Sequence, residues 1–205
     1  MKKNLGILYN FPFVYFYFIA MNILYGKGYH DRYKKIADEI APFSSVVDVC
    51  CGDAKLYQYL KPKKVRYLGL DISKSFVQML NKRGVEARLF DIRKDTIPKC
   101  DYIVIQGSLY QFKKHAEIIN KLYTATKKVL IVAEPVKKFE DSFIGKTFVR
   151  WVVPFLVGTE NNDKHFRFSE KEFRKLLEKY KPNYIRIKGE RDLIAVIKKN
   201  EVLNR

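Results

Sequence analysis

Short apolar runs alternate with helical patterns from residue 46 onward, and this order limits the fold more than any other feature of the sequence. The runs are continuous stretches rich in Val, Ile, Leu and Tyr, which is typical of parallel strands buried on both faces. They read VVDVC (46–50), VRYLGLD (65–71), EARLFD (86–91), DYIVIQ (101–106) and VLIVAE (129–134). We predict that each run forms a strand of one sheet.

Helical patterns separate these runs. Ser73 can cap a helix in SKSFVQMLNKR (73–83), and Gly84 is a good stop signal after it. A second helix is expected over 112–127, where apolar residues recur at helical spacing. Strands that alternate with helices predict an α/β fold with an open, doubly wound and mostly parallel sheet.

The C-terminal part predicts how the sheet ends. SEKE (169–172) is a capping box at the start of a helix. Two further strand-like runs, YIRIKG (184–189) and DLIAVIKK (192–199), are joined by Glu190 and Arg191 alone. So short a link permits a hairpin but not a parallel crossover. We therefore expect one domain with a seven-stranded sheet and an antiparallel C-terminal strand.

Two adjacent cysteines follow the first predicted strand, in VVDVCCGDAKL (46–56). Neighbouring cysteines rarely bond to each other because the disulfide is strained, and CC lacks the spacing of a redox CxxC. With Cys100 and the three histidines they form no metal-ligand pattern, so we predict no metal. The stretch is better interpreted as a run of small residues where a strand turns into a helix, which lets the backbone approach a ligand.

Asp71 ends the second predicted strand, 23 residues after Asp48. An acidic side chain at this place in an α/β sheet can accept both hydroxyls of a ribose. A dinucleotide-binding loop would read G-x-G-x-x-G, whereas this loop has only Gly52. The loop and Asp71 together predict a site for an adenosine-containing ligand.

Five motifs, in order and at fitting spacing, resemble the class I S-adenosylmethionine-dependent methyltransferases. The family's D-x-G-x-G-x-G loop corresponds to DVCCGDA (48–54), and YLGLDIS (67–73) resembles its ribose-binding strand. RLFDIRK (88–94), CDYIVIQGSLYQF (100–112) and KKVLIVAEP (127–135) are similar to its third, fourth and fifth strands. The resemblance covers about residues 30–200. It implies a Rossmann-like fold, methyl transfer and S-adenosyl-L-methionine as cofactor.

The resemblance also implies which residues hold that cofactor. Asp48 and the loop N–H groups would bind the methionine part, and Asp71 would bind the ribose. Asp91 with Ile92 would meet the adenine, and Gln106 would lie where donor and acceptor meet. The implied cofactor-binding residues are Tyr29, Arg32, Asp48, Cys50, Cys51, Gly52, Asp53, Asp71, Ile72, Asp91, Ile92 and Gln106.

Two features of the family pattern differ in this chain. Cys50 and Ala54 stand where the family has loop glycines; both are small, which is compatible with cofactor binding, but they put in doubt whether the loop needs positive φ at these positions. Gln-Gly-Ser-Leu-Tyr (106–110) replaces the Asn/Asp-Pro-Pro-aromatic motif of enzymes that methylate the amino groups of adenine or glutamine. No catalytic residue stands out; the candidate general bases are Tyr29, His30, Tyr110, His115 and His165.

Two apolar, aromatic segments would build the lid over the acceptor. We expect residues 1–28 to form an N-terminal lid or membrane-interfacial segment, and residues 29–205 to form the methyltransferase domain with a lid insertion at about 137–168. Residues 4–26 carry no charge, so a core helix or a membrane span is also open for them. Such lids favour an apolar or amphipathic small-molecule acceptor, such as a lipid, isoprenoid or quinone-like molecule.

The formal net charge of +18 is spread along the whole chain. A general lysine bias explains it, and so does a charged partner such as an anionic membrane, to which the protein would dock peripherally. RNA is the other polyanion, so a tRNA or rRNA methyltransferase is the alternative function. A cofactor-binding protein without catalysis is the third. Three cysteines without disulfide spacing favour a cytoplasmic location.

Overall fold

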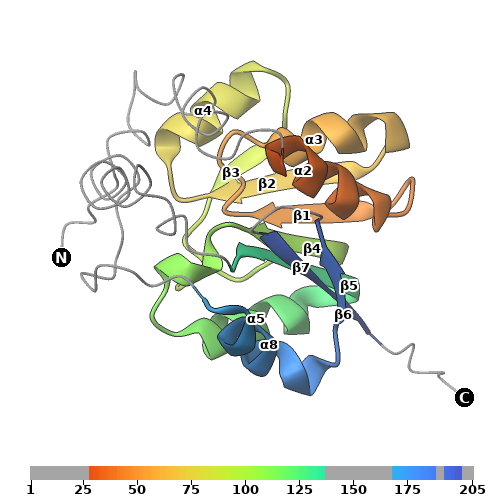
Figure 1. Ribbon diagram of the computed structural model, residues 1–205. Coiled ribbons are helices and arrows are strands. Elements are labelled where there is room, and N and C mark those ends of the chain that lie inside the picture. The colour runs from red at the N-terminus through yellow and green to blue at the C-terminus, as the bar shows by residue number, and fades with distance from the viewer. Residues whose placement is uncertain (1–27, 137–167, 188–191, 200–205) are drawn as a thin grey trace, which may run out of the picture.

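The computed structural model describes residues 28–136, 168–187 and 192–199. Within these residues, seven strands form one sheet in the order β3-β2-β1-β4-β5-β7-β6 (Figure 1). The strands are β1 (Ser45–Val49), β2 (Arg66–Asp71), β3 (Ala87–Leu89), β4 (Cys100–Gln106), β5 (Thr126–Pro135), β6 (Asn183–Arg186) and β7 (Asp192–Lys198). The predicted seven-stranded α/β sheet is confirmed.

Strand direction follows the prediction as well. Strands β1 to β5 pair in parallel, whereas β7 pairs antiparallel with both β5 and β6. The chain begins in the middle of the sheet at β1, moves outward to β3, and returns to place β4 on the other side of β1. Open α/β sheets bind ligands at such a reversal, outside the carboxyl ends of the strands. The fold therefore points to the ends of β1 and β4.

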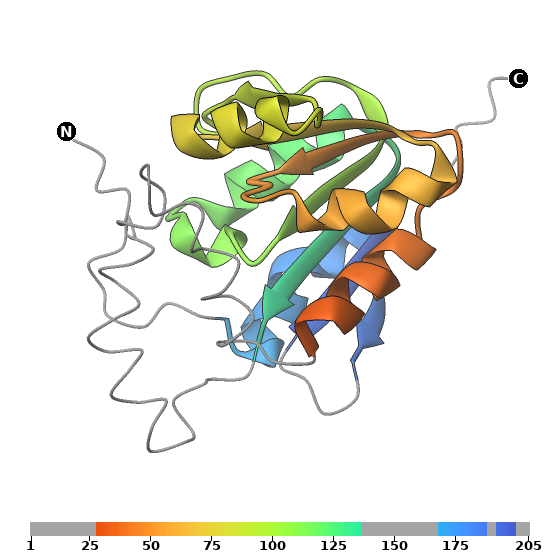
Figure 2. The ribbon, with the colours of Figure 1, turned by 90° about the horizontal axis from the view of Figure 1, so that it is seen from above.

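Helices cover both faces of the sheet (Figures 1 and 2). On one face, Ile36, Leu56 and Phe76 belong to a single apolar cluster with the sheet. On the other face, Ile119 and Phe173 belong to a second cluster. The helices of the first face are α2 (Gly28–Asp38), α3 (Lys55–Leu60) and α4 (Lys74–Lys82), and those of the second are α5 (His115–Ala125) and α8 (Glu170–Leu177). Burial on both faces explains why the strands are continuously apolar.

The predicted helix caps are present. Ser73 Oγ accepts the N–H of Phe76 at the start of α4. At α8, Ser169 Oγ accepts the N–H of Glu172, whose carboxylate in turn accepts the N–H of Ser169. Each cap satisfies N–H groups that the first helical turn leaves without a partner.

Several predicted boundaries differ from the structure by one to three residues, and two of them have a local cause. The helix expected over 112–127 is shorter, because α5 ends at Ala125 and Thr126 already has the extended backbone of β5. Thr126 donates its hydroxyl to the carbonyl of Leu122, which ends the helix with a side-chain bond. The first strand ends at Val49 rather than Cys50, because Cys50 has a left-handed backbone that cannot continue a strand.

The two expected lid segments, residues 1–28 and about 137–168, lie almost wholly outside the described residues. Among the helices that the structure describes, none is long and apolar enough to cross a bilayer.

Candidate functional site

The loop after β1 is built on left-handed backbone. Cys50, Gly52 and Ala54 have φ values of 58°, 54° and 52°. These are the three positions at which the resembled loop pattern carries glycine. The loop therefore does adopt positive φ at Cys50 and Ala54, which the absence of glycine there had put in doubt. The loop keeps its glycine-like conformation with two residues that adopt it at a cost of about 1–2 kcal/mol each.

Hydrogen bonds to the end of β2 hold this loop in place. The Cys51 N–H donates to the Leu70 carbonyl at 3.2 Å, and the Gly52 N–H donates to Asp71 Oδ2 at 2.8 Å. The buried Cys51 side chain lies against Gly69, where an added Cβ would come within 2.8 Å of Sγ. The predicted small-residue turn is thus packed directly on the neighbouring strand.

Both cysteines have the environment of inert thiols. Desolvation, together with the nearby charges of Asp71 and Asp48, raises the pKa of the Cys50 and Cys51 thiols well above the usual range. Thiolates are the reactive form, so neither side chain is set up as a nucleophile. The carboxylates of Glu134 and Asp91 also act on Cys50, which shows that acidic groups surround the loop.

Asp71 is the best-placed of the predicted ligand residues. It is 5% exposed at the end of β2, and its two oxygens accept the N–H groups of Gly52 and Ser73, each at 2.8 Å. Burial raises the pKa of Asp71 to about 6, and these backbone bonds oppose that rise. A carboxylate oxygen has two acceptor sites, so each oxygen can still accept a hydroxyl.

Asp48 and Gln106 lie on adjacent strands at the switch point. Asp48 is fully buried and accepts the Tyr67 hydroxyl at 2.9 Å through Oδ2. Burial raises its pKa to about 7, opposed by the Tyr67 bond and by a weaker contact with Gln106. Among the described residues, Asp48 Oδ1 and Gln106 Oε1 are buried oxygens without a hydrogen-bond partner. Such atoms need an explanation, and a ligand group is one.

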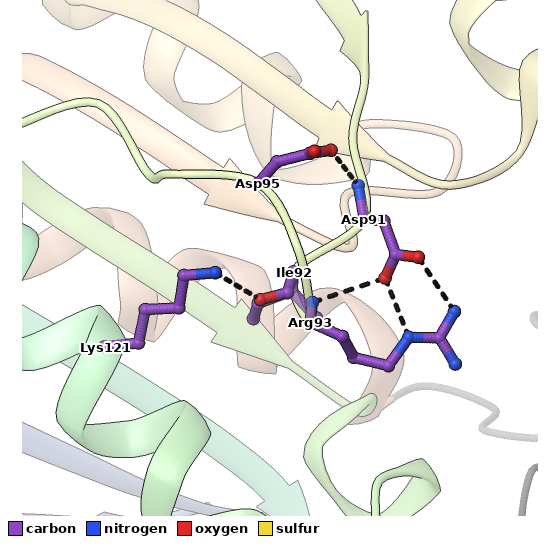
Figure 3. A network of polar contacts seen from close by, with 5 residues as sticks. All are labelled: Asp91, Ile92, Arg93, Asp95 and Lys121. Carbon is purple, nitrogen blue, oxygen red and sulfur yellow. Dashed lines mark hydrogen bonds and ion pairs between the residues drawn. The ribbon is translucent and has the colours of Figure 1, made fainter.

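The predicted adenine residues follow β3 in a tightly bonded turn (Figure 3). The Asp91 carboxylate takes two bonds from the Arg93 guanidinium, at 2.7 and 3.1 Å, while its own N–H donates to Asp95. The buried Ile92 presents its carbonyl to Lys121 of α5 at 2.7 Å. Arg93 and Lys121 thus fix the turn, and contact of Asp91 and Ile92 with an adenine ring stays a prediction.

The other predicted cofactor residues are spread around the same edge. Asp53 is half-buried and accepts the Lys55 N–H at 3.3 Å, and burial raises its pKa. Ile72 is half-buried directly after Asp71. Tyr29 lies in the first turn of α2, and Arg32 of the same helix is buried, 3.4 Å from Asp192.

Two buried acidic residues beside the site were not predicted. Glu134 ends β5 and accepts the N–H groups of Ser108 and Leu109 through Oε1, at 2.9 and 2.7 Å. Burial raises its pKa to about 7. Asp192 begins β7 and pairs with Arg32. The available signal was an acidic residue at one end of an apolar run, in VLIVAE and in DLIAVIKK.

Two of the candidate bases, His30 and His115, make contacts outside this group. His30 is exposed and bonded to the Tyr59 hydroxyl at 2.7 Å. His115 packs edge-on against Phe168, and burial lowers its pKa. Tyr110 is half-buried, and His165 lies outside the described residues.

With this geometry in hand, the comparisons identify the family. The family model of the methionine biosynthesis protein MetW matches residues 30–143, more than half of the 205 residues. The chain belongs to the MetW family. No curated protein matches this MetW-family chain.

Solved structures support the fold of this MetW-family chain. Magnesium protoporphyrin IX methyltransferase from Synechocystis, with bound S-adenosylhomocysteine, is similar at a TM-score of 0.63 and 15% identity, with 84% of each chain covered. A methyltransferase from Thermotoga maritima described as a possible histamine N-methyltransferase has a TM-score of 0.62 at 13% identity, covering 89% of this chain and 95% of its own. A third, from Aquifex aeolicus, has a TM-score of 0.57 at 16% identity, covering 86% and 92%. The MetW-family chain therefore has the class I methyltransferase fold that its motifs predict.

Strain in the loop gives a stability prediction. Cys50→Gly should raise the free energy of unfolding by about 1 kcal/mol, because glycine removes the left-handed strain and only partly offsets that gain through unfolded-state entropy. Gly52→Val should destabilise the loop, because a β-branched residue is a poor fit at a φ of 54°. Urea denaturation measures both. A Cys50→Gly protein that is folded but inactive would contradict the inert-thiol interpretation.

Buried carboxyl groups give a pH prediction. The raised pKa values of Asp48 and Glu134 mean that the folded state binds more protons than the unfolded state between about pH 4 and 7. Stability from these groups is therefore complete at low pH and lost as pH rises through 7. Glu134→Gln should reduce the loss between pH 5 and 8 by roughly 1–3 kcal/mol in urea denaturation. The exposed Glu117→Gln is the control, and an unchanged slope in Glu134→Gln would refute the assignment.

Proposed function

We propose that this MetW-family chain is an S-adenosylmethionine-dependent methyltransferase acting on an apolar or amphipathic small molecule. One observation carries the cofactor part of the proposal. The Asp71 carboxylate bonds to the Gly52 N–H and thereby aligns a glycine-like loop at the switch point of a class I methyltransferase fold.

The residues present fit the proposed cofactor. Asp71 keeps acceptor capacity on both oxygens for the two ribose hydroxyls. Among the described residues, Asp48 Oδ1 is a buried acceptor without a hydrogen-bond partner, which suits an ammonium group of the methionine part. The turn at Ile92, held by Lys121, is where we assign the adenine ring. These acceptor atoms therefore suit a ligand that carries several hydrogen-bond donors along one edge.

Catalysis in this proposal rests on positioning. S-adenosylmethionine supplies a methyl group that its sulfonium already activates. The chain's part is to hold donor and acceptor in line and to exclude water, which can account for much of a rate enhancement. Gln106, at the end of β4, is the residue to which we assign the place where the two would meet.

The acceptor class rests on the sequence. Residues 4–26 and 137–168 are both rich in apolar and aromatic residues, and they flank the domain at the places where acceptor lids are expected. An apolar lid favours an apolar or amphipathic acceptor. A net charge of +18 supports docking on anionic lipid.

Calorimetric titration with S-adenosylhomocysteine tests the cofactor. The protein should bind it, and Asp71→Ala should weaken binding by about 10- to 100-fold, because hydrogen bonds to a charged group are lost. Asp38→Ala, an exposed residue at the end of α2, should bind normally. No binding at millimolar ligand, or full affinity in Asp71→Ala, would sink the proposal.

Vesicle co-sedimentation tests the membrane contact. The protein should pellet with vesicles containing phosphatidylserine at low salt and dissociate as salt rises, because electrostatic attraction is screened. Neutral phosphatidylcholine vesicles are the control. Equal recovery in the supernatant with both vesicles would count against an acceptor taken from an anionic membrane.

A further inference from the structure

Four buried oxygens without a hydrogen-bond partner lie on four adjacent strands. Among the described residues, these atoms are Asp48 Oδ1 on β1, Gln106 Oε1 on β4, Glu134 Oε2 on β5 and Asp192 Oδ1 on β7. Strands β1, β4, β5 and β7 are neighbours in that order, and all four residues lie at the edge where the parallel strands end. The Gln106 amide oxygen is always an acceptor, and the three carboxyl oxygens are acceptors when their groups are ionised, so each of these four atoms can accept a donor.

Among the described residues, one cation, Arg32, accompanies the two acidic groups Glu134 and Asp192 in the β5 and β7 half of this edge. Arg32 Nη1 lies 3.4 Å from Asp192 Oδ2, and 3.7 Å from where a Cβ on Gly107 would stand. Glu134 is within electrostatic reach of both Arg32 and Asp192. The Arg32–Asp192 separation is longer than the 2.7–2.9 Å of a strong charge-assisted bond. The Arg32 guanidinium thus pairs with Asp192 at a long distance and also acts electrostatically on Glu134.

A purely structural role, in which the Arg32–Asp192 ion pair links α2 to β7, explains only part of this arrangement. It accounts for Arg32 and for Asp192 Oδ2. It leaves Gln106 Oε1, Glu134 Oε2 and Asp192 Oδ1 buried without donors. Burying a carboxylate without a partner is costly, and the cost falls if a proton or a ligand cation neutralises it. The raised pKa of Glu134, caused by burial, is the first of these responses.

Gln106 connects this half of the edge with the proposed cofactor site. It contacts Asp48 on one side, and it pairs with Ala133, the residue before Glu134, on the other. A group bound between Gln106, Glu134 and Asp192 would therefore lie on the acceptor side of the cofactor. We call these three residues the acidic subsite.

We propose that the acidic subsite binds a protonated amine carried by the methyl acceptor. An ammonium group supplies one positive charge and three donors, which matches one surplus carboxylate and three acceptors without donors. The inference rests on the proposed methyltransferase function.

General electrostatics cannot produce the same preference. The chain carries a net charge of +18, so its overall field repels cations and attracts anions. Preference for an amine over a carboxylate of the same skeleton therefore requires local acidic groups. Comparing an amine with a carboxylate of the same skeleton therefore distinguishes the effect of the local acidic groups from that of the overall charge.

Calorimetric titration at pH 8 with phenethylamine, 2-phenylethanol and 3-phenylpropionate tests the subsite, with and without saturating S-adenosylhomocysteine. The amine should bind at least about tenfold more tightly than the other two probes. Glu134→Gln and Asp192→Asn should each remove most of that preference. Glu117→Gln, which removes an equal charge from the exposed face of α5, should retain it.

Each outcome decides the question. Equal binding of the three probes, or preference for the carboxylate, overturns the subsite. If the protein still binds S-adenosylhomocysteine in that case, the proposed function stands. Loss of the preference in Glu117→Gln also overturns it. Absence of S-adenosylhomocysteine binding sinks the proposed function, and the titrations without it still decide the subsite. If Glu134→Gln does not fold, Asp192→Asn and the wild-type pH profile replace it, because amine affinity should fall as pH drops below 7.

Discussion

The bond between the Gly52 N–H and the Asp71 carboxylate is the contact on which the site depends. Asp71 also accepts the N–H of Ser73, so one side chain fixes the turn after β1 and the start of α4. The Cys51 N–H adds a backbone bond to Leu70 on the same strand. The proposed ligand surface therefore lies where the loop after β1 is hydrogen-bonded to the end of β2, and these two adjacent strand ends determine its shape.

The loop after β1 contains strained backbone, because two of its non-glycine residues adopt a conformation that their residue types disfavour. Cys50 and Ala54 adopt left-handed conformations that glycine would adopt freely. Such strain persists where surrounding structure over-determines the backbone, and it concentrates at functional sites. Here the over-determination comes from Asp71, from Leu70 and from the Cys51 side chain packed against Gly69. The adjacent cysteines thus act through their size and packing, while burial keeps their thiols protonated.

Local sequence patterns predicted the strands and helices, whereas the loop conformation and the long-range side-chain contacts depend on residues that are far apart in the sequence. Apolar runs and caps at Ser73 and Ser169 located strands and helices, because these signals act within a few residues. The short link before Asp192 predicted the antiparallel strand. The positive φ at Cys50 could not be predicted from residue type, since hydrogen bonds from another strand impose it. Contact between Arg32 and Asp192 joins residues 160 positions apart, and no local pattern carries such information.

The distribution of charge separates the surface from the site. The chain as a whole is strongly basic, yet among the described residues the carboxyl edge of the sheet buries Asp48, Asp71, Glu134 and Asp192 together with the Arg32 guanidinium. Burial raises the pKa of Asp48, Asp71 and Glu134 toward neutrality, so a cationic ligand at this edge would displace protons from them. Binding of a sulfonium or an ammonium there would then release protons and stabilise the fold together. A basic surface that attracts anionic lipid is compatible with an acidic interior edge that selects cations. Salt screens the exposed surface charges over about 10 Å, whereas the buried carboxylates act on a bound cation at short range and in a low dielectric.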